Sequence, residues 1–273
     1  MVADGEELVV HRLHRRAVVR AAEGYRKVVR PGRAGAVASA SGTLAEPCAD
    51  AGIATAAVLG ATDDTVTFAT LPGRTLHELG AAGLSGWMAV AQAWPRLVRA
   101  VPEGGELGVH DAAREADTLL TWVGHAERFG AFGDRVRVLR AAAKSVAAEL
   151  VAGRPDAEGV VHRDLHDKQV LWAAAGDTLG LLDLDTAARG EPALDLANLN
   201  AHVDLRVRQG VWSPATADAI ASALAPIAGA VGASAERLGT YERSARLRLA
   251  CVYAFRPGSQ AWLESWLEDA LAG

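Results

Sequence analysis

The 273-residue sequence predicts an α+β fold in two lobes, a small β-rich lobe over residues 1–70 and a larger, mostly helical lobe over residues 76–273. Two patterns predict this division. Short valine-rich runs separated by turn residues fill the first lobe, whereas apolar residues with helical spacing dominate the second. Between the two lobes, Pro72 and Gly73 interrupt the chain, so residues 71–75 are expected to form a hinge.

The first lobe is expected to contain five strands and one helix. Strands are predicted at residues 8–13, 17–22, 25–30, 58–59 and 65–69. Glu23 and Gly24 mark the turn between the second strand and the third. An alanine-rich stretch at residues 34–50 predicts the helix, although Gly42 and Pro47 weaken it.

The second lobe is expected to be helical around a few short buried strands. Helices are predicted at residues 84–101, 110–129, 135–152, 194–205, 216–231, 234–253 and 260–271. Short apolar runs predict the strands, at residues 160–161, 170–172 and 179–184. These strands flank the most informative motif of the chain.

That motif is the run VHRDLHDKQVL at residues 161–171, which sets His162 and Asp164 among apolar residues. Asp183 follows nineteen positions after Asp164, at the end of a second apolar run. Phosphoryl transfer from a nucleotide needs two such carboxylates. One orients the attacking hydroxyl and accepts its proton, and the other holds the magnesium ion that neutralises charge on the phosphates. The spacing of the two residues therefore indicates nucleotide-dependent phosphoryl transfer.

At these residues the chain resembles the kinase-like phosphotransferases, which include the aminoglycoside phosphotransferases and the choline kinases. The resemblance is strongest over residues 160–201, where the family pattern is His-x-Asp-x-x-x-x-Asn, then a strand, then Asp. It implies a protein-kinase-like two-lobed fold, ATP or GTP as the phosphoryl donor, and Mg2+. By this resemblance Asp164 is the catalytic base, His162 braces the catalytic loop and Asp183 binds the metal.

The resemblance extends to four further residues. Gln169 stands where the family usually has Asn, a second metal ligand, and its amide oxygen on a longer arm can still reach magnesium. The run ARGEPALDLAN at residues 188–198 resembles the family segment Gly-x-Pro-x-x-Asp-Leu-Ala, in which Asp195 would cap a helix and support the catalytic loop. Asp185 has family counterparts, and His166 lies inside the catalytic loop near the expected substrate hydroxyl, so both are assigned to loop support or substrate contact.

The remaining nucleotide contacts are expected in the first lobe. Lys27 is the only lysine of that lobe and lies on the predicted third strand, where the family places the lysine that binds the α- and β-phosphates. Glu46, late in the predicted helix, is the candidate carboxylate partner of Lys27. Backbone groups of Ala69 and Leu71, next to the hinge, would hydrogen-bond a purine.

The turn at residues 13–17, Leu-His-Arg-Arg-Ala, lacks the glycines that let backbone amides approach phosphates closely. Two interpretations stay open. His14 and the arginines bind phosphate by charge, or the turn is only a basic surface hairpin. For Asp204 and Arg206, a solvated helix face is favoured over a place in a substrate pocket.

Composition argues against several other classes of protein. A formal net charge of -5 argues against nucleic acid or an anionic membrane as the main partner. Cys48 and Cys251 form no Cys-x-x-Cys motif, which argues against a structural disulfide and a zinc site. The N-terminus lacks the apolar segment of a signal peptide. No stretch approaches the roughly 18 apolar residues of a membrane span. A cytoplasmic enzyme with a small-molecule partner and no obligate protein partner is therefore expected.

No residue pattern identifies the acceptor. By resemblance, an aminoglycoside or another hydroxylated natural-product antibiotic is expected first, with a role in antibiotic resistance, and a sugar or an amino alcohol comes next. Two other classes stay open: a kinase that modifies a biosynthetic peptide, and a nucleotide-binding pseudokinase. The glycine-free turn and Gln169 favour the pseudokinase, whereas the presence of both Asp164 and Asp183 opposes it.

Overall fold

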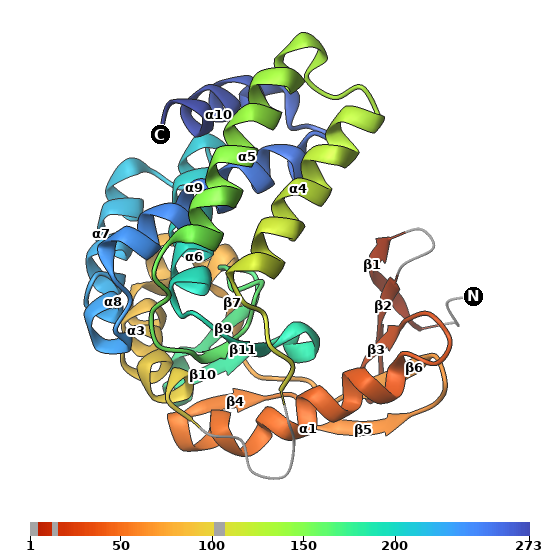
Figure 1. Ribbon diagram of the computed structural model, residues 1–273. Helices are drawn as coiled ribbons and strands as arrows, with labels where there is room; N and C mark the ends of the chain where they lie inside the picture. The colour runs from red at the N-terminus through yellow and green to blue at the C-terminus, as the bar shows by residue number, and fades with distance from the viewer. Residues whose placement is uncertain (1–4, 13–15, 101–106) are drawn as a thin grey trace.

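The computed structural model describes residues 5–12, 16–100 and 107–273. It has the two-lobed α+β arrangement that the sequence predicts (Figure 1). A small sheet with helix α1 lies on one side of an opening, and a larger helical lobe lies on the other.

A five-stranded antiparallel sheet forms most of the N-terminal lobe. Its strands follow the spatial order β1 (Glu7–Arg12), β2 (Arg16–Ala21), β3 (Gly24–Val28), β6 (Thr65–Phe68) and β5 (Val58–Ala61). All five predicted strands are present, with ends that differ by one or two residues. Lys27 on β3 lies opposite Val18 of β2 and Val66 of β6.

Helix α1 (Ala34–Ala51) covers one face of this sheet and packs against Val66. Pro47 lies inside the helix and does not end it. Farther along, α1 enters the main core through Leu44 and Cys48, which are fully buried. The helix therefore belongs to both lobes.

A second sheet joins the two lobes. Strand β4 (Ile53–Thr55) of the first 70 residues pairs in parallel with β10 (Thr178–Leu181) of the helical lobe. Strands β9 (Val170–Ala173) and β7 (Arg74–Thr75) complete the order β4-β10-β9-β7. Strand β4 was not predicted, because a strand of three residues carries too little periodicity to be recognised.

A third sheet supports the loop that carries Asp164. It pairs β8 (Gly159–Val161), which precedes the loop, with β11 (Ala188–Gly190). The loop runs from β8 to β9, and the chain leaves β10 through a short 3-10 helix, η4 (Leu184–Thr186). Both candidate carboxylates thus lie just beyond the ends of short buried strands.

Helices occur at all the predicted positions, and one short helix at residues 76–79 was not predicted. They are α2 (Leu76–Leu79), α3 (Leu84–Val98), α4 (Ala112–Arg128), α5 (Val136–Ala152), α6 (Ala193–Arg208), α7 (Pro214–Leu224), α8 (Pro226–Val231), α9 (Ala235–Tyr253) and α10 (Gln260–Ala272). The single helix predicted at residues 216–231 is instead two helices. Pro226 begins the second of them, because proline suits the first turn of a helix better than its interior.

Helix α6 is the central helix of the larger lobe. Leu196, Leu199 and Val203 on one side pack with α3, α7, α8 and the second sheet. Ala197 and Ala201 on the other side pack with α4, α5, α9 and α10. A helix that is buried on both sides is held rigidly, and it can position polar groups precisely where it carries them.

No stretch of membrane-spanning length was expected from the sequence, but one segment of the described residues, Pro214–Val231, is long and apolar enough by composition to cross a membrane. It corresponds to α7 and α8. Ile220, Leu224 and Ile227 of this segment are buried in the same hydrophobic core as Leu44 and Cys48, as in the core helices of globular proteins.

Candidate active site

Four buried polar residues on helix α6 hold the loop at residues 162–169 in place. They recur three or four positions apart, so they share one face of the helix. They are Asp195, Asn198, His202 and Arg206. This set is called the α6 polar line below.

The first two members of the α6 polar line fix the backbone around Asp164. The carboxylate of Asp195 accepts hydrogen bonds from the backbone N–H groups of His162, at 2.6 Å, and Arg163, at 2.8 Å. The amide of Asn198 donates to the carbonyl of Leu165 at 2.8 Å. The backbone is therefore tied down on both sides of Asp164.

The last two members hold the rest of the loop. The ring of His202 stacks on that of His166, with 4.7 Å between centroids. Arg206 donates to both carboxylate oxygens of Asp167, at 2.8 and 2.7 Å. Burial works against ionisation of Asp167, but hydrogen bonds from His77 and Arg206 outweigh it and hold the pKa of that carboxyl well below its usual range.

The side chain of His162 joins the loop to the end of β10. Its Nδ1 accepts the backbone N–H of Asp164 at 3.3 Å, so the proton resides on Nε2, which donates to the carbonyl of Leu182 at 2.7 Å. Thr186 also donates its hydroxyl to the carbonyl of His162 at 3.0 Å. These contacts put His162 between the segments that carry Asp164 and Asp183.

Asp164 is more exposed than the carboxylates around it. Its side chain retains 45% of its accessible surface, compared with 1% for Asp167 and 19% for Asp183. The nearest ring nitrogen, His166 Nε2, is 3.9 Å from Asp164 Oδ2, beyond hydrogen-bonding distance. An accessible carboxylate on a rigid loop has the placement that a general base requires.

His166 is a neutral neighbour of Asp164. Burial lowers the pKa of His166 to about 4, so the ring carries no charge near pH 7. Its Nδ1 accepts the backbone N–H of Lys168 at 3.1 Å, which leaves the proton on the nitrogen that faces Asp164. His166 can therefore donate a hydrogen bond toward the site without adding a positive charge.

Lys27 meets two carboxylates at the end of β10. Its Nζ lies 2.5 Å from Asp183 Oδ1 and 2.6 Å from Asp185 Oδ1. Burial works against the charge on Asp183, but the adjacent cations Lys27 and Arg16 hold the pKa of Asp183 well below its usual range. Residues far apart in sequence thus form one compact charged cluster.

The expected pairing of Lys27 with Glu46 does not occur in the structure. Helix α1 turns Leu44 and Cys48 into the core, which leaves Glu46 on the exposed side of the helix. The carboxylates that contact Lys27 come instead from Asp183 and Asp185.

Gln169 and Asp183 have side chains suited to a magnesium ion. Gln169 Nε2 lies 3.5 Å from Asp183 Oδ2, and rotation of the amide exchanges its nitrogen for its oxygen. Magnesium takes hard oxygen ligands, with one or two from the protein and the rest from water and phosphate. No group of three or more His, Cys, Asp or Glu residues suited to a metal occurs at residues 5–12, 16–100 or 107–273.

The glycine-free turn is described only in part. Residues 13–15, with His14 and Arg15, lie outside the described residues. Arg16, the first residue of β2, donates from Nη1 to Asp183 Oδ2 at 3.1 Å. For Arg16 the structure therefore disagrees with a plain surface hairpin.

Ala69 and Leu71 lie where the chain passes from the first sheet to the second. The N–H of Ala69 donates to the carbonyl of Ala57 at 2.9 Å, so a purine contact at Ala69 would use its carbonyl oxygen. Gly73 has a φ of 101°, and a Cβ there would lie 2.7 Å from the backbone carbonyl carbon of Trp172. Glycine therefore lets the chain run close against β9. The nucleotide contacts of Ala69 and Leu71 remain predictions.

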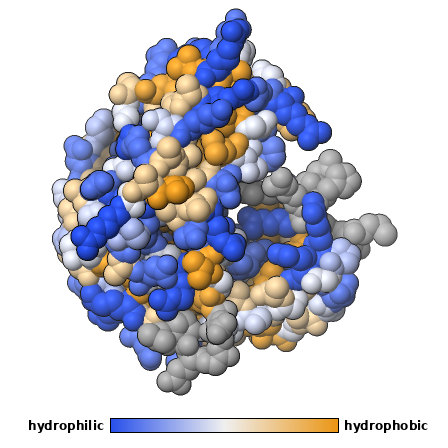
Figure 2. All heavy atoms as spheres, in the orientation of Figure 1, coloured by the Kyte–Doolittle hydropathy of each residue, from blue (hydrophilic) through white to orange (hydrophobic). Residues whose placement is uncertain are grey.

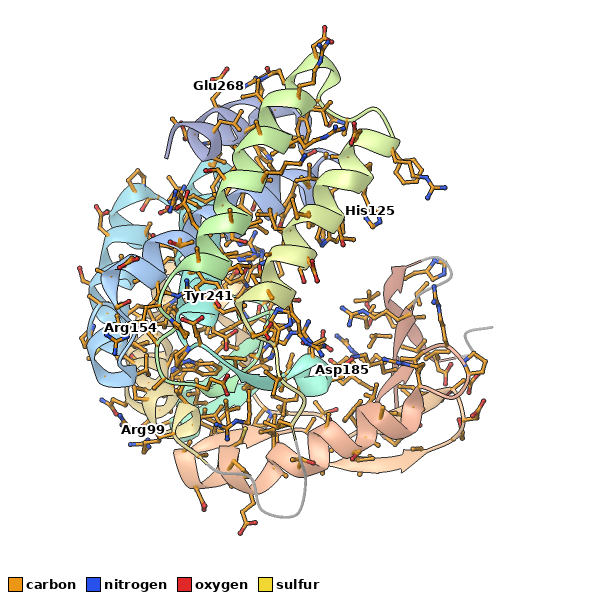
Figure 3. All side chains as sticks on the ribbon, in the orientation of Figure 1. Arg99, His125, Arg154, Asp185, Tyr241 and Glu268 are labelled. Carbon is orange, nitrogen blue, oxygen red and sulfur yellow. The ribbon has the colours of Figure 1, made fainter. Side chains whose placement is uncertain are left out.

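The site faces the opening between the lobes. Figure 2 shows a hollow between α4 and the N-terminal sheet, with hydrophilic residues along much of its edge. In Figure 3, Asp185 lies at the inner end of this opening, and His125 projects toward it from α4.

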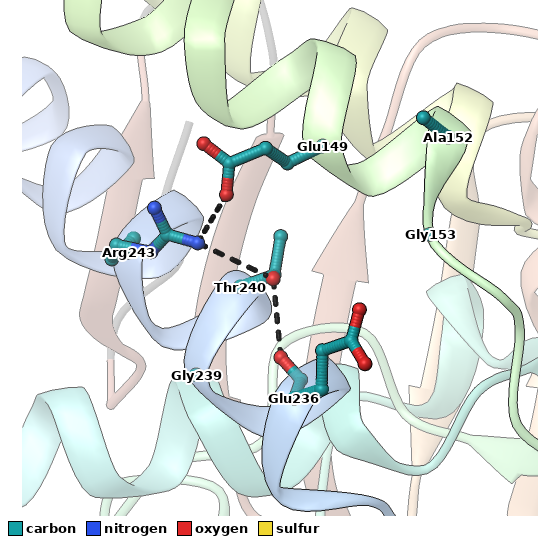
Figure 4. A pocket seen from close by; sticks show the side chains of 7 residues that line it. All are labelled: Glu149, Ala152, Gly153, Glu236, Gly239, Thr240 and Arg243. Atoms are coloured by element: carbon teal, nitrogen blue, oxygen red, sulfur yellow. Dashed lines mark hydrogen bonds and ion pairs between the residues drawn. The ribbon is translucent and has the colours of Figure 1, made fainter.

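A second hollow lies between α5 and α9 (Figure 4). It includes Arg243, which donates hydrogen bonds to Glu149 and Thr240. None of the residues that line it belongs to the segments that carry Asp164 and Asp183. The hollow is therefore separate from the candidate active site.

Most of the α6 polar line was not predicted from the sequence. Arg206 was expected on a solvated helix face, but it is 1% exposed and paired with Asp167. Asp204 does lie on the exposed face, where it pairs with Arg246. The available signal was the recurrence of polar residues every three or four positions from the recognised Asp195 onward, in an otherwise apolar helix.

The two lobes and the charged site between them define a kinase-like phosphotransferase. Residues 28–219, more than half of the chain, match the sequence model of the phosphotransferase enzyme family (APH), and the chain belongs to this family. The protein is therefore a phosphotransferase with an alcohol group as the acceptor. A comparison with curated protein sequences gives no match.

Solved structures show the same fold. Aminoglycoside phosphotransferase APH(3'')-Id from Streptomyces rimosus is 21% identical, with a TM-score of 0.62 over 91% of this chain and 92% of that chain. Choline kinase LicA from Streptococcus pneumoniae is 11% identical, with a TM-score of 0.63 over 98% and 92%. An ethanolamine kinase from Plasmodium vivax is 9% identical, with a TM-score of 0.56 over 99% and 82%. These likenesses establish the fold.

Proposed function

We propose that this protein transfers the terminal phosphoryl group of ATP, bound with Mg2+, to a hydroxyl group of a small molecule in the cytoplasm. The observation that carries the proposal is the exposed carboxylate of Asp164 on a loop that the α6 polar line holds rigid. A structure of APH(3'')-Id in complex with ADP and streptomycin supports the choice of an adenine nucleotide.

Asp164 acts on the acceptor. Its carboxylate orients the acceptor hydroxyl and takes the proton as the hydroxyl oxygen bonds to the γ-phosphorus. The bond between the γ-phosphorus and the β–γ bridging oxygen breaks, and ADP leaves. His166 can donate a hydrogen bond to the same hydroxyl region, because its protonated nitrogen faces Asp164.

Asp183 and Gln169 would hold the magnesium ion, which neutralises charge on the phosphates. Lys27, already directed into the same cluster, would bind the α- and β-phosphates. Asp185 keeps Lys27 directed into the site, while His162 fixes the distance between the two carboxylate-bearing segments. Positioning and electrostatics thus supply most of the rate.

The proposed acceptor is an aminoglycoside or another hydroxylated natural-product antibiotic, with a role in antibiotic resistance. The likeness to APH(3'')-Id over nine-tenths of both chains supports this choice. An amino alcohol is the second candidate, because choline kinase LicA matches with a similar TM-score.

The test is phosphoryl transfer from ATP to a panel of aminoglycosides, other hydroxylated natural products, sugars and amino alcohols. Asp164→Asn is expected to lower turnover by about 100- to 10,000-fold while ATP binding persists, because only the proton acceptor is lost. Asp177→Asn, an exposed Asp outside the site, is the matched control. ATP binding without transfer to any acceptor would instead support the pseudokinase.

A further inference from the structure

Arg16 stands on the same face of the N-terminal sheet as Lys27. On β2, Val18 lies directly opposite Lys27, and residues directly opposite one another project to the same face. Arg16 precedes Val18 by two positions, so its side chain leaves the strand on that face as well. Two cations from adjacent strands therefore point to the same place.

Both cations meet the same carboxylate. Arg16 Nη1 lies 3.1 Å from Asp183 Oδ2 and 3.4 Å from Oδ1, and Lys27 Nζ lies 2.5 Å from Oδ1. The side chain of Arg16 is 25% exposed, so it is largely enclosed by the site. Its Nε is buried and has no hydrogen-bond partner among the described residues. A buried N–H without a partner is costly unless a ligand supplies one.

We propose that Arg16 binds the outer phosphates of the nucleotide and does the work of a glycine-rich phosphate loop. The inference rests on the proposed function. Backbone amides approach phosphates closely only where glycines allow it, and the turn before Arg16 has none. A guanidinium presents a planar fork of donors that matches phosphate oxygens and can bind two of them at once.

The ion pair with Asp183 orients the side chain of Arg16. The carboxylate holds the guanidinium beside the place where a magnesium-bound phosphate would lie, so little side-chain freedom remains to be lost on binding. Phosphate oxygens can engage the donors of Arg16 that Asp183 does not use, including the buried Nε. A purely structural ion pair would need no further donor.

The test is calorimetric binding of ATP with magnesium, and of AMP, to the wild type, Arg16→Ala and Arg16→Lys. Arg20→Ala is the matched control, because Arg20 lies on the same strand but is 55% exposed and pairs with Glu7. Arg16→Ala is expected to weaken ATP binding by about 10- to 100-fold, the usual effect of losing charged hydrogen bonds. AMP binding should change less than about twofold, because AMP lacks the outer phosphates. Arg16→Lys should recover part of the loss, and Arg20→Ala should bind ATP as the wild type does.

Unchanged or tighter ATP binding by Arg16→Ala would overturn the inference, since Arg16 would then only screen Asp183. An equal loss of ATP and AMP binding would also overturn it, because the effect would not depend on the outer phosphates. If the wild type bound no ATP at millimolar concentration, the proposed function would fail and this inference with it. Thermal unfolding of each variant checks that the fold is retained.

Discussion

Arg206 and Asp167 form a bidentate ion pair in the interior, with distances of 2.8 and 2.7 Å and side chains that are 2% and 1% exposed. The pair fastens the C-terminal part of α6 to the loop that carries Asp164. His77 Nδ1 also lies 2.5 Å from the same carboxylate. The loop is therefore held both by the central helix and by the segment that follows the hinge.

Replacing Arg206 with Met should destabilise the protein by about 3–5 kcal/mol, because it leaves a buried carboxylate without its main counter-charge. Urea unfolding measures the free energy directly. Arg208→Ala is the control on the same helix, since Arg208 is 38% exposed and its loss should cost less than about 1 kcal/mol. The double variant Arg206→Met with Asp167→Asn should regain part of the stability. Equal effects of the changes at positions 206 and 208 would contradict this account.

Asp185 is expected to matter for nucleotide binding, and Glu46 is not. Asp185→Asn should weaken ATP binding about tenfold, because Lys27 loses a charged hydrogen bond that directs its ammonium group. Glu46→Gln should leave the affinity for ATP unchanged, since Glu46 lies on the exposed side of α1. Calorimetry measures the affinity of the two variants for ATP. A larger loss in Glu46→Gln than in Asp185→Asn would indicate that Glu46 is the partner of Lys27.

The stability of the protein should depend on pH through Asp195. Burial raises the pKa of Asp195 to about 6, whereas an unfolded aspartate titrates near 4. The folded state therefore binds the proton more tightly, so this stabilising contribution is complete below pH about 4 and is lost as the pH rises through about 6. Asp195→Asn removes the titration.

The measurement is the free energy of unfolding of the wild type and Asp195→Asn at pH 5.0 and 7.5. The wild type should lose about 1.4 kcal/mol relative to the variant over this interval, as follows from one titrating group with that pKa. Asp177→Asn serves as the exposed comparison. A difference between wild type and Asp195→Asn that stays constant or changes in the opposite direction would refute the assignment.

Much of the fold was predictable because it depends on local patterns. The valine-rich strands of the first lobe and most helices of the second occur within a few residues of their predicted positions. The elements that were missed are short, such as β4, or were merged, such as α7 with α8. In both cases, pairing or packing with distant segments defines the element, and no local pattern reveals it.

The sequence by itself determined the class of chemistry, because Asp164 and Asp183 can be recognised by residue type and spacing alone. Only the tertiary structure decided which groups surround these carboxylates. The rotation of α1, set by the burial of Leu44 and Cys48, excluded Glu46 from the site. The strand register brought Arg16 and Lys27 to Asp183, more than 150 positions away in sequence. Contacts across such separations depend on how whole elements pack, and no local pattern of residues encodes that packing.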